Sequence, residues 1–454
     1  MTAGQTDERN GLLATRVGFQ ISPYLTTLLL FVIALLPRLP GLDRFLTSDE
    51  NTNIFFAGSD VVAAFLAGNW RGTYWHFYPG VTMSWLDGLG MAGHYLLDLL
   101  TGQPVPSFTE YVYGDILSLL VANRLPYAIL TAAAVPAMYL LARQLLPQRM
   151  ALLGALFIAF DPFYLAHSRV AHGDAPVAVF MSLSTLAFFI YGESIIGSAG
   201  RSESLTAFLW QRRSIYLLLS AIFGSLAALT KAPGQFMVIF VIGMAIIYAG
   251  LAWRQTTSDP LSAILLRWLL VVISWGLISL VVFVLLWPSM WVDPVGTLRQ
   301  MLDETFGKVD QGHLVYFFGA PTLDPGPWFY LYVIPFRLTP VVLIGSLLSF
   351  LIFIPKVNDW LRLQESERRT IFFLWLFTIS LLLFGNLSPK KQDRYLLPLF
   401  PFLNFLAAVG WLGVVGLISH RAHPRYRYAA PLAIASILAL LLFHLWPTFS
   451  CYPY

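Results

Sequence analysis

Charged residues are scarce in this 454-residue chain, and cysteine is almost absent. Asp, Glu, Lys and Arg make up 11% of the residues, against about 25% in a typical soluble protein. A water-exposed surface this poor in charge would aggregate, which excludes an ordinary soluble enzyme. The lone Cys451 excludes an internal disulfide and a cysteine-ligated metal cluster. The glycine-rich phosphate loop of ATPases and the His-Glu-x-x-His metal motif are also missing.

Apolar residues dominate instead, at 57% of the chain. A membrane-spanning helix needs about 20 mostly apolar residues, and such runs recur along the sequence. We therefore predict an all-α polytopic membrane protein, with one transmembrane domain over residues 21–446 and about eleven spans. The predicted spans are 21–37, 114–142, 150–166, 175–192, 215–230, 234–252, 268–287, 329–354, 370–386, 396–418 and 429–446.

The charge of the connecting segments predicts which side of the membrane each one faces. With residues 1–20 in the cytoplasm, the inner segments carry a net charge of +8 and the rest of the chain −4. This distribution obeys the positive-inside rule. The long segments 38–113 and 288–328 then form two outer loops, and residues 447–454 form an outer C-terminal stub, with a truncated chain as the alternative. Because the basic residues are dispersed, we expect no nucleic-acid partner.

Five separated polar clusters fall at the outer membrane boundary in this topology. Polar residues at membrane depth are costly and usually functional, so their shared side predicts a single site. We expect Asp49, Asp174, Lys231 and Arg394 to lie in one pocket open to the outer face. The five clusters are Asp49-Glu50, His76, His172-Gly173-Asp174, Lys231 with Pro233-Gly234, and Lys390-Lys391-Gln392-Asp393-Arg394.

The carboxylates in these clusters are candidates for acid–base chemistry. Adjacent carboxylates such as Asp49 and Glu50, close to a low-dielectric boundary, suit a general base. Asp174 is a second carboxylate held at the same depth by a short turn. Helix capping is the alternative interpretation, with Ser48 or Asp49 starting one helix and Asp174 another.

The cations predict binding of an anionic ligand. Arg124 opens the second predicted span, and a guanidinium binds phosphate through two parallel hydrogen bonds and stays charged when buried. Snorkelling to the membrane surface is the alternative for Arg124. Lys231, Lys391 and Arg394 lie on the outer face, where the positive-inside rule predicts few cations. An anionic substrate explains them, and lipid headgroups are the competing explanation.

Aromatic residues surround a histidine in the first outer loop, in Trp75-His76-Phe77-Tyr78-Pro79-Gly80. Such a run is typical of an interfacial aromatic belt. It also suits a groove for a lipid or sugar, in which His76 and Tyr78 would contact the substrate together with His172.

The order and spacing of these motifs resemble the protein O-mannosyltransferase family of lipid-linked glycosyltransferases, within the GT-C superfold. Lipid A aminoarabinose transferases are similar relatives. One departure is His76-Phe77-Tyr78-Pro79, where the family has His-Pro-Pro. The motifs that carry the resemblance are Asp49-Glu50, His76 to Gly80, Asn123-Arg124-Leu125-Pro126, Asp161 to Arg169 leading to Asp174, Leu229 to Gly234, and Lys391 to Pro398.

The resemblance implies the GT-C fold and a sugar donor linked to a lipid phosphate. It implies that Asp49 matches the catalytic base, that Arg124 matches a donor-phosphate contact, and that neither a metal nor another cofactor takes part. Within this scheme we assign Glu50 to orienting Asp49 or the acceptor. We expect Lys231, Lys391 and Arg394 to stabilise the departing phosphate.

We therefore expect an inverting membrane glycosyltransferase of a prokaryotic plasma membrane, acting on the extracytoplasmic face. It would move a sugar, such as the hexose mannose, from a polyprenyl-phosphate donor to a hydroxyl of a protein, lipid or glycan, among membrane lipids. A transporter or flippase of lipid-linked anions is the main alternative, and a structural envelope subunit is another. An oligosaccharyltransferase is disfavoured because the Trp-Trp-Asp motif is missing.

Overall fold

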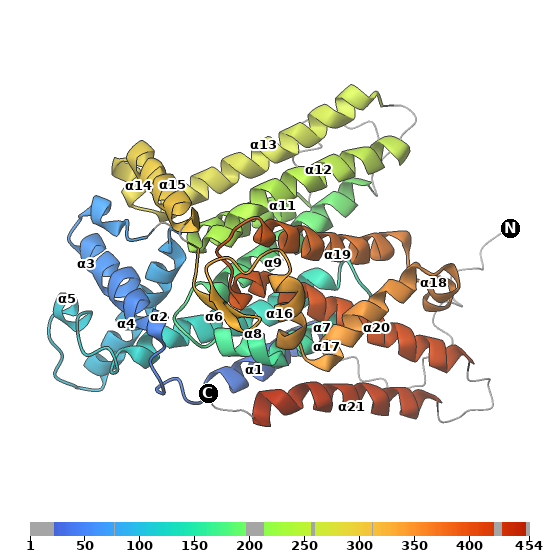
Figure 1. Ribbon diagram of the computed structural model, residues 1–454, viewed down its shortest axis with the longest axis horizontal. Coiled ribbons are helices and arrows are strands. Elements are labelled where there is room, and N and C mark those ends of the chain that lie inside the picture. The colour runs from blue at the N-terminus through green and yellow to red at the C-terminus, as the bar shows by residue number, and fades with distance from the viewer. Residues whose placement is uncertain are drawn as a thin grey trace.

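A bundle of long helices dominates the structure, a computed structural model that describes residues 22–76, 78–196, 213–255, 259–310, 312–421 and 429–450. The long helices run broadly along one axis of the molecule (Figure 1). The bundle consists of α1 (Pro23–Leu35), α6 (Leu120–Ala142), α7 (Gln148–Phe160), α9 (Asp174–Ile196), α11 (Ser214–Thr230), α12 (Phe236–Gln255), α13 (Leu261–Leu286), α16 (Phe329–Arg337), α17 (Pro340–Leu348), α19 (Glu365–Asn386), α20 (Phe400–Arg421) and α21 (Ala429–Ser450).

Shorter elements join these helices. The inter-helix segments are η1 (Leu36–Arg38), α8 (Pro162–His167), η4 (Ala232–Gln235), η5 (Ser349–Phe353), α18 (Pro355–Leu361) and η6 (Asp393–Leu399). In the described part of the chain, β-structure is limited to an antiparallel hairpin of β1 (Val315–Phe317) and β2 (Ala320–Thr322).

The predicted all-α membrane fold is confirmed, and each of the eleven predicted spans coincides with a helix or a pair of helices. Six helices of the described residues are long and apolar enough to cross a membrane alone, and a bent pair would be a seventh. The other predicted spans correspond to apolar helices of 10–17 residues. The count of eleven therefore stays a prediction.

The predicted span 329–354 is not one straight helix. Its two halves, α16 and the α17–η5 segment, are bent by 114° relative to each other. Pro340 opens α17 and Thr339 caps it, since the Thr339 hydroxyl accepts a hydrogen bond from Val342 N at 3.4 Å. A proline lacks the N–H that would continue the preceding helix, and it disfavours helical geometry in the residue before it.

Helix α9 is the centre of the bundle. An 18-residue apolar stretch of α9 is completely buried, whereas only 11% of the corresponding stretch of α13 is buried. Helices α6, α11, α12 and α20 contact α9, so α9 is apolar on every side while α13 exposes apolar side chains at the edge of the bundle. This contrast is expected of an inner and a lipid-facing helix, because a helix that is hydrophobic all round is a buried or a membrane helix.

The first long outer segment, predicted as a loop over 38–113, is largely helical. It contains α2 (Ser48–Thr52), the π-helical η2 (Asn53–Asp60), α3 (Val61–Leu66), η3 (Trp70–Thr73), α4 (Val81–Leu100) and α5 (Phe108–Tyr111). The second, 288–328, contains α14 (Ser289–Val292), α15 (Pro294–Asp310) and the β-hairpin. Both gather at the left end of the bundle in Figure 1, which we call the site end.

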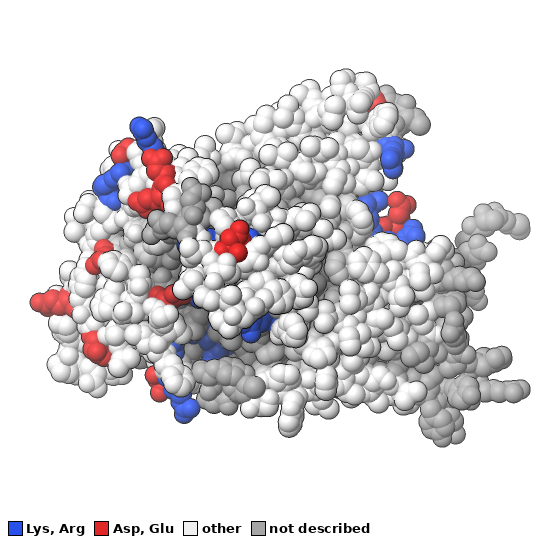
Figure 2. All heavy atoms as spheres, viewed as in Figure 1, with Lys and Arg blue, Asp and Glu red and all other residues white. Residues whose placement is uncertain are grey.

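The opposite end contains described residues of four segments predicted to face the cytoplasm. A cavity of about 690 Å³ there is lined by Arg143, Arg213, Gln255 and Glu365, from four different predicted inner segments. Figure 2 shows charged side chains toward both ends of the visible face and an almost uncharged surface between them. The alternation of segments between two ends therefore agrees with the sequence pattern, and their orientation in the membrane stays a prediction.

Glycines allow the tightest helix contact. A Cβ atom added to Gly410 on α20 would lie 1.9 Å from the carbonyl oxygen of Gly345 on α17 and 2.7 Å from Ser349 N. Backbone atoms cannot move aside as a flexible side chain can, so only glycine fits. Small residues have this function at many membrane helix interfaces, where packing replaces the hydrophobic effect.

We expect Gly410→Ala to destabilise the protein by about 1–3 kcal/mol, the usual cost of overpacking, and to lower its thermal unfolding temperature in detergent. Gly413→Ala on the same helix is the matched control, because its Cβ would meet only Leu361 Cδ1 at 3.7 Å. Equal unfolding temperatures for the two variants would contradict the close α17–α20 contact.

Candidate active site

The start of α2 positions Asp49 and Glu50. Thr47 precedes this helix, and the Glu50 carboxylate accepts a hydrogen bond from Thr47 N at 3.0 Å, half of a capping box. The cap residue is therefore Thr47, and the alternative that Ser48 or Asp49 caps the helix is wrong. Because consecutive helical residues point about 100° apart, Glu50 faces the interior and Asp49 faces the site.

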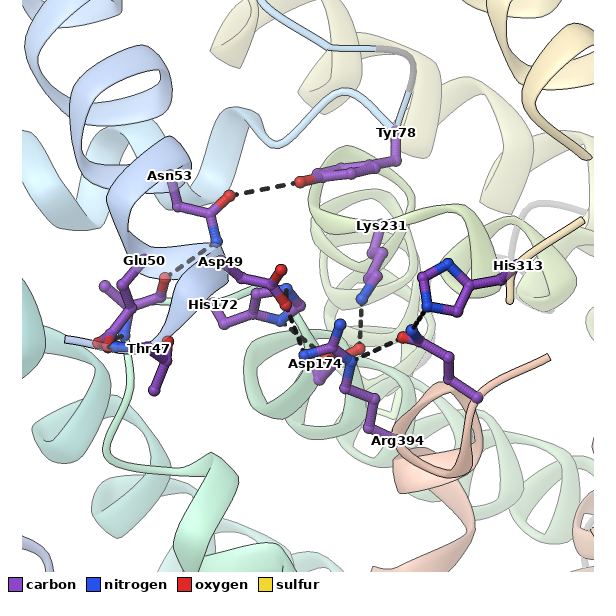
Figure 3. Close-up of polar contacts among 12 residues, drawn as sticks. Thr47, Asp49, Glu50, Asn53, Tyr78, His172, Asp174, Lys231, His313 and Arg394 are labelled. Atoms are coloured by element: carbon purple, nitrogen blue, oxygen red, sulfur yellow. Dashed lines mark hydrogen bonds and ion pairs between the residues drawn. The ribbon is translucent and has the colours of Figure 1, made fainter. Parts of the chain in front are cut away.

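Five side chains from four separate segments meet at the site end, and we call them the charged cluster: Asp49, His172, Asp174, Lys231 and Arg394. Asp49 lies on α2, His172 and Asp174 lie at the turn into α9, Lys231 follows α11, and Arg394 lies on η6. Figure 3 shows these side chains pointing toward one another. The structure therefore brings together the four residues expected in one pocket, together with His172, which was predicted to contact the substrate.

Asp174 is the centre of this cluster. Lys231 Nζ lies 2.5 Å from Asp174 Oδ1, and His172 Nδ1 lies 2.7 Å from Asp174 Oδ2. Arg394 Nε approaches Asp174 Oδ2 at 3.5 Å. The Asp174 side chain is only 1% exposed, so these groups compensate a carboxylate that has almost no contact with solvent.

Asp49 is the accessible carboxylate of the cluster, with 40% of its side chain exposed. Its Oδ2 lies 2.6 Å from Arg394 Nη1 and 3.5 Å from His172 Nε2. Burial raises the pKa of Asp49, but the charge and the hydrogen bond of Arg394 outweigh it and hold the pKa below its usual value. In this arrangement Asp49 is an ionised carboxylate that is neutralised by Arg394.

His172 is held as a neutral imidazole. Its burial lowers its pKa, and the cations Lys231 and Arg394 act in the same direction, whereas Asp174 opposes them. The contact of Nδ1 with a carboxylate places a proton on Nδ1, since an ionised carboxylate only accepts. The unprotonated Nε2 therefore faces Asp49.

Arg124 and Glu50 lie outside the charged cluster, in a buried ion pair. Arg124 Nε and Nη2 each donate to Glu50 at 2.6 Å. The remaining three N–H groups donate to backbone carbonyls of the chain before α2, at Leu42, Arg44 and Phe45. All five donors of the guanidinium are therefore in use, and they tie the chain before α2 to α6.

Glu50 extends this connection to the turn that carries His172. Its Oε1 accepts a hydrogen bond from Ala171 N at 2.9 Å, and its pKa lies below the usual range because Arg124 and these backbone donors outweigh the effect of burial. One buried carboxylate thus joins α2, α6 and the 167–174 turn. In this way Glu50 sets the position of Asp49.

Of the predicted groove residues, His172 is part of the charged cluster, and Tyr78 lies beside it. His76 contacts two aromatic rings, with centroids 4.9 Å from Trp75 and 3.9 Å from Tyr78, and these two rings also contact each other at 5.6 Å. Tyr78 donates to Asn53 Oδ1 at 3.4 Å, and its ring lies 5.9 Å from Lys231 Nζ. Tyr395 approaches Lys231 from another side at 5.0 Å.

Lys391 lies beside the cluster and is not part of it. Its Nζ pairs with Asp324 of the second outer segment at 3.1 Å, and the lysine is almost completely buried. Its predicted contact with the donor phosphate therefore stays a prediction.

Two polar residues of the site carried no role in the sequence analysis. Gln392 accepts a hydrogen bond from Arg394 Nε at 2.9 Å, and its amide nitrogen contacts His313 Nε2. Gln392 lies inside a motif that was singled out for its cations, so its position in the sequence could have indicated that it belongs to the site. His313 lies in the long second outer segment, and its residue type and spacing alone did not distinguish it.

An apolar cavity of about 200 Å³ opens next to this site, between α3, α4 and the junction of α13 with α14. Its lining includes Val61, Phe65, Trp85 and Trp287. A hydrogen bond of 2.7 Å between Thr82 and Thr230, the residue before Lys231, connects the α4 wall to the charged cluster. In the described part of the chain, no group of three or more His, Cys, Asp or Glu side chains is arranged to hold a metal ion.

Comparison with known proteins identifies the fold. Residues 111–291 match the model of the dolichyl-phosphate-mannose-protein mannosyltransferase family. ArnT from Cupriavidus metallidurans bound to undecaprenyl phosphate superposes with a TM-score of 0.50 at 16% identity, over 92% of this chain and 70% of that one. The chain has the GT-C fold. The family match over residues 111–291 confirms the resemblance seen in the sequence.

The GT-C fold is also shared with an Archaeoglobus fulgidus oligosaccharyltransferase. Its apo form has a TM-score of 0.56 at 13% identity over 95% of this chain. The complex of AglB from the same organism with an inhibitory peptide and a dolichol-phosphate has a TM-score of 0.54 at 13% identity over 94%. The chain spans 55% of the length of both archaeal chains. No curated protein matches the chain in sequence.

We expect Arg124→Lys to destabilise the protein by about 3–5 kcal/mol, because breaking a buried pair leaves Glu50 incompletely compensated. Lysine has three donors and cannot replace five in a planar fork. Arg143→Lys at the opposite end is the control, since Arg143 stacks on Tyr139 and is only half-buried. Thermal unfolding in detergent measures both, and a similar effect of the two changes would argue against the positioning role of Arg124.

Proposed function

We propose that this protein is a membrane glycosyltransferase that uses a polyprenyl-phosphate sugar donor. The observation that carries the proposal is the charged cluster, with an accessible carboxylate beside two cations, at one end of a GT-C fold. Two proteins with this fold were solved with lipid phosphates, undecaprenyl phosphate on ArnT and a dolichol-phosphate on AglB. The cations of the cluster suit a ligand of this chemistry.

The balance of charge supports binding of an anion at Arg394. The two carboxylates Asp49 and Asp174 neutralise the cations Lys231 and Arg394. A sugar-phosphate diester brings one negative charge, and Arg394 is the partly exposed cation of the cluster. The donor phosphate therefore competes with Asp49 for the guanidinium. Once Arg394 turns to the phosphate, Asp49 loses its strongest neighbour and its pKa rises toward that of a useful base.

The proposed reaction is a displacement at the anomeric carbon of the donor. The acceptor hydroxyl oxygen forms a bond to this carbon while the bond to the phosphate oxygen breaks, and the hydroxyl proton passes to Asp49. The polyprenyl phosphate leaves with its charge stabilised by Arg394 and Lys231. One base and one stabilised leaving group produce inversion without a covalent intermediate. The sugar is proposed to be a hexose such as mannose, after the family model that matches.

The other predicted residues take supporting roles in this proposal. Asp174 and His172 hold the cations in place, and Glu50 with Arg124 fixes the helix that carries Asp49. A direct contact of Arg124 with the phosphate would require one of its five N–H groups to leave its present acceptor.

The surroundings of the cluster suit an amphipathic donor. The rings of His76 and Tyr78 offer stacking surfaces for a sugar, and the apolar cavity beside α4 offers room for isoprenoid units. A lipid-linked donor would enter from the membrane with its tail among the helices. We propose that the site end faces outward at a prokaryotic plasma membrane, that residues 1–20 are cytoplasmic, and that the acceptor is a protein, lipid or glycan hydroxyl.

We expect Asp49→Asn to lower sugar transfer by about 10²–10⁴-fold, the usual contribution of a general base. The change is nearly isosteric, so folding and donor binding should persist. Purified protein is incubated with radiolabelled polyprenyl-phosphate mannose and membrane acceptors, and the label on protein, lipid and glycan is counted. Thermal unfolding of the same samples controls for the fold.

Asp60→Asn is the matched control, because Asp60 lies on the same helical run and only accepts a hydrogen bond from Tyr113 at 2.9 Å. Its transfer rate should equal that of the parent. If Asp49→Asn retains the parental rate and Glu50→Gln abolishes it, the two roles are exchanged. If the parent moves the labelled donor across a vesicle membrane without transferring the sugar, the protein is a flippase instead.

A further inference from the structure

A segment of the second outer region is attached at two points to the residues just before η6, directly beside the charged cluster. His313 contacts Gln392, and Asp324 pairs with Lys391 at 3.1 Å. The hairpin of β1 and β2 lies between these two attachments, and His313 N donates to Leu323 O at 3.3 Å where the segment closes. Figure 3 shows His313 and Arg394 on the same side of the site, and Gln392 contacts both of them.

The hydrogen-bonding capacity of Arg394 determines the direction of this chain of contacts. A guanidinium has donors only, so the Gln392 atom 2.9 Å from Arg394 Nε is the amide oxygen. The amide nitrogen of Gln392 must then face His313 Nε2 and donate to it. His313 can accept only if Nε2 is unprotonated, which places the proton of the neutral ring on Nδ1.

We propose that His313 is a positioning residue that, in its neutral form, sets the orientation of the Arg394 guanidinium through the amide of Gln392. The orientation matters because Arg394 Nη1 contacts Asp49 at 2.6 Å. This inference rests on the proposed function, in which the same guanidinium passes from Asp49 to the donor phosphate.

Protonation of His313 breaks this series of hydrogen-bond contacts. The doubly protonated ring has donors at both nitrogens, so its Nε2–H would face the amide N–H groups of Gln392. The amide then turns over to offer its oxygen to His313. Its nitrogen now faces Arg394 Nε–H, so two donors meet. Arg394 Nε loses its acceptor at 2.9 Å and keeps the longer 3.5 Å contact with Asp174.

The charges around His313 favour the neutral form. Burial lowers the pKa of His313, and the cations Lys390 and Arg394 lower it further, while Asp49 acts in the opposite direction. The pKa therefore lies below the ordinary value of about 6.5. The aligned state is present above this pKa and is lost as the pH falls through it.

Transfer kinetics of three variants test the role. His313→Leu removes the acceptor and should lower kcat by about tenfold or more, since misplaced groups lose much of their catalytic effect. His313→Gln keeps an acceptor at similar reach without titrating near neutral pH. It should recover most of the lost rate. When the pH falls from 7.5 to about 5.5, His313→Gln should lose a smaller fraction of its transfer rate than the parent does.

His94→Gln is the matched control. His94 lies on α4 at the same end of the molecule, 3.3 Å from Asp98, and its replacement should leave both the rate and the pH profile unchanged. Equal transfer rates of His313→Leu and His313→Gln would overturn the proposal. So would a transfer rate of His313→Gln that falls at low pH as steeply as that of the parent.

A spectroscopic readout is independent of sugar transfer. Protein labelled with ¹⁵N-histidine in detergent should show His313 as the Nδ1–H tautomer at pH 7.5, with the signal assigned by its loss in His313→Gln. Gln392→Leu should abolish this preference. An Nε2–H tautomer in the parent refutes the chain of contacts even if transfer is observed. An Nδ1–H tautomer together with no sugar transfer refutes the proposed function alone.

Discussion

A carboxylate almost without solvent contact must be compensated by nearby cations, and this requirement at Asp174 organises the site. Asp174 begins α9, the helix that is buried on every side, so water cannot stabilise its charge. Removing one partner of such a buried group costs several kcal/mol. Lys231 and Arg394 supply the positive charge from different segments, and the neutral His172 adds a close contact through Nδ1. Their meeting point places the exposed Asp49 beside a cation that can also serve a substrate.

Asp49 and Glu50 show how a helix separates the roles of two adjacent carboxylates. Glu50 faces inward, where one arginine and two backbone N–H groups surround it, whereas Asp49 faces the open side of the cluster. The sequence presented them as an equivalent pair, and the family resemblance alone ranked Asp49 first. The structure gives a physical reason for the ranking. A fully satisfied, buried carboxylate is a structural link, and a partly exposed one is available to a hydroxyl.

Much of the fold and of the cluster was predictable, because membrane helices leave a strong signal. Apolar runs marked the segments that form the bundle, and charge asymmetry sorted their ends. The bend at Pro340 and the helices α4 and α5 within 38–113 were missed, since hydropathy does not report helix direction and helices outside the apolar spans leave a weaker signal. Arg124 was predicted at the site but is engaged elsewhere, because a residue type cannot reveal which acceptors surround it. His313 was missed because a single histidine in a long segment has no pattern.

The distances along the chain between the cluster residues have a consequence for biosynthesis. Asp49 and Asp174 are made first, whereas Arg394 lies on η6, 220 residues after Asp174. Until that segment is inserted, Asp49 has no guanidinium partner, and Asp174 depends on Lys231 and His172. The helices can assemble stepwise, but the complete cluster forms only after η6 has been made. A nascent chain that stalls before η6 would thus lie in the membrane with an incomplete site, and it could not consume a donor.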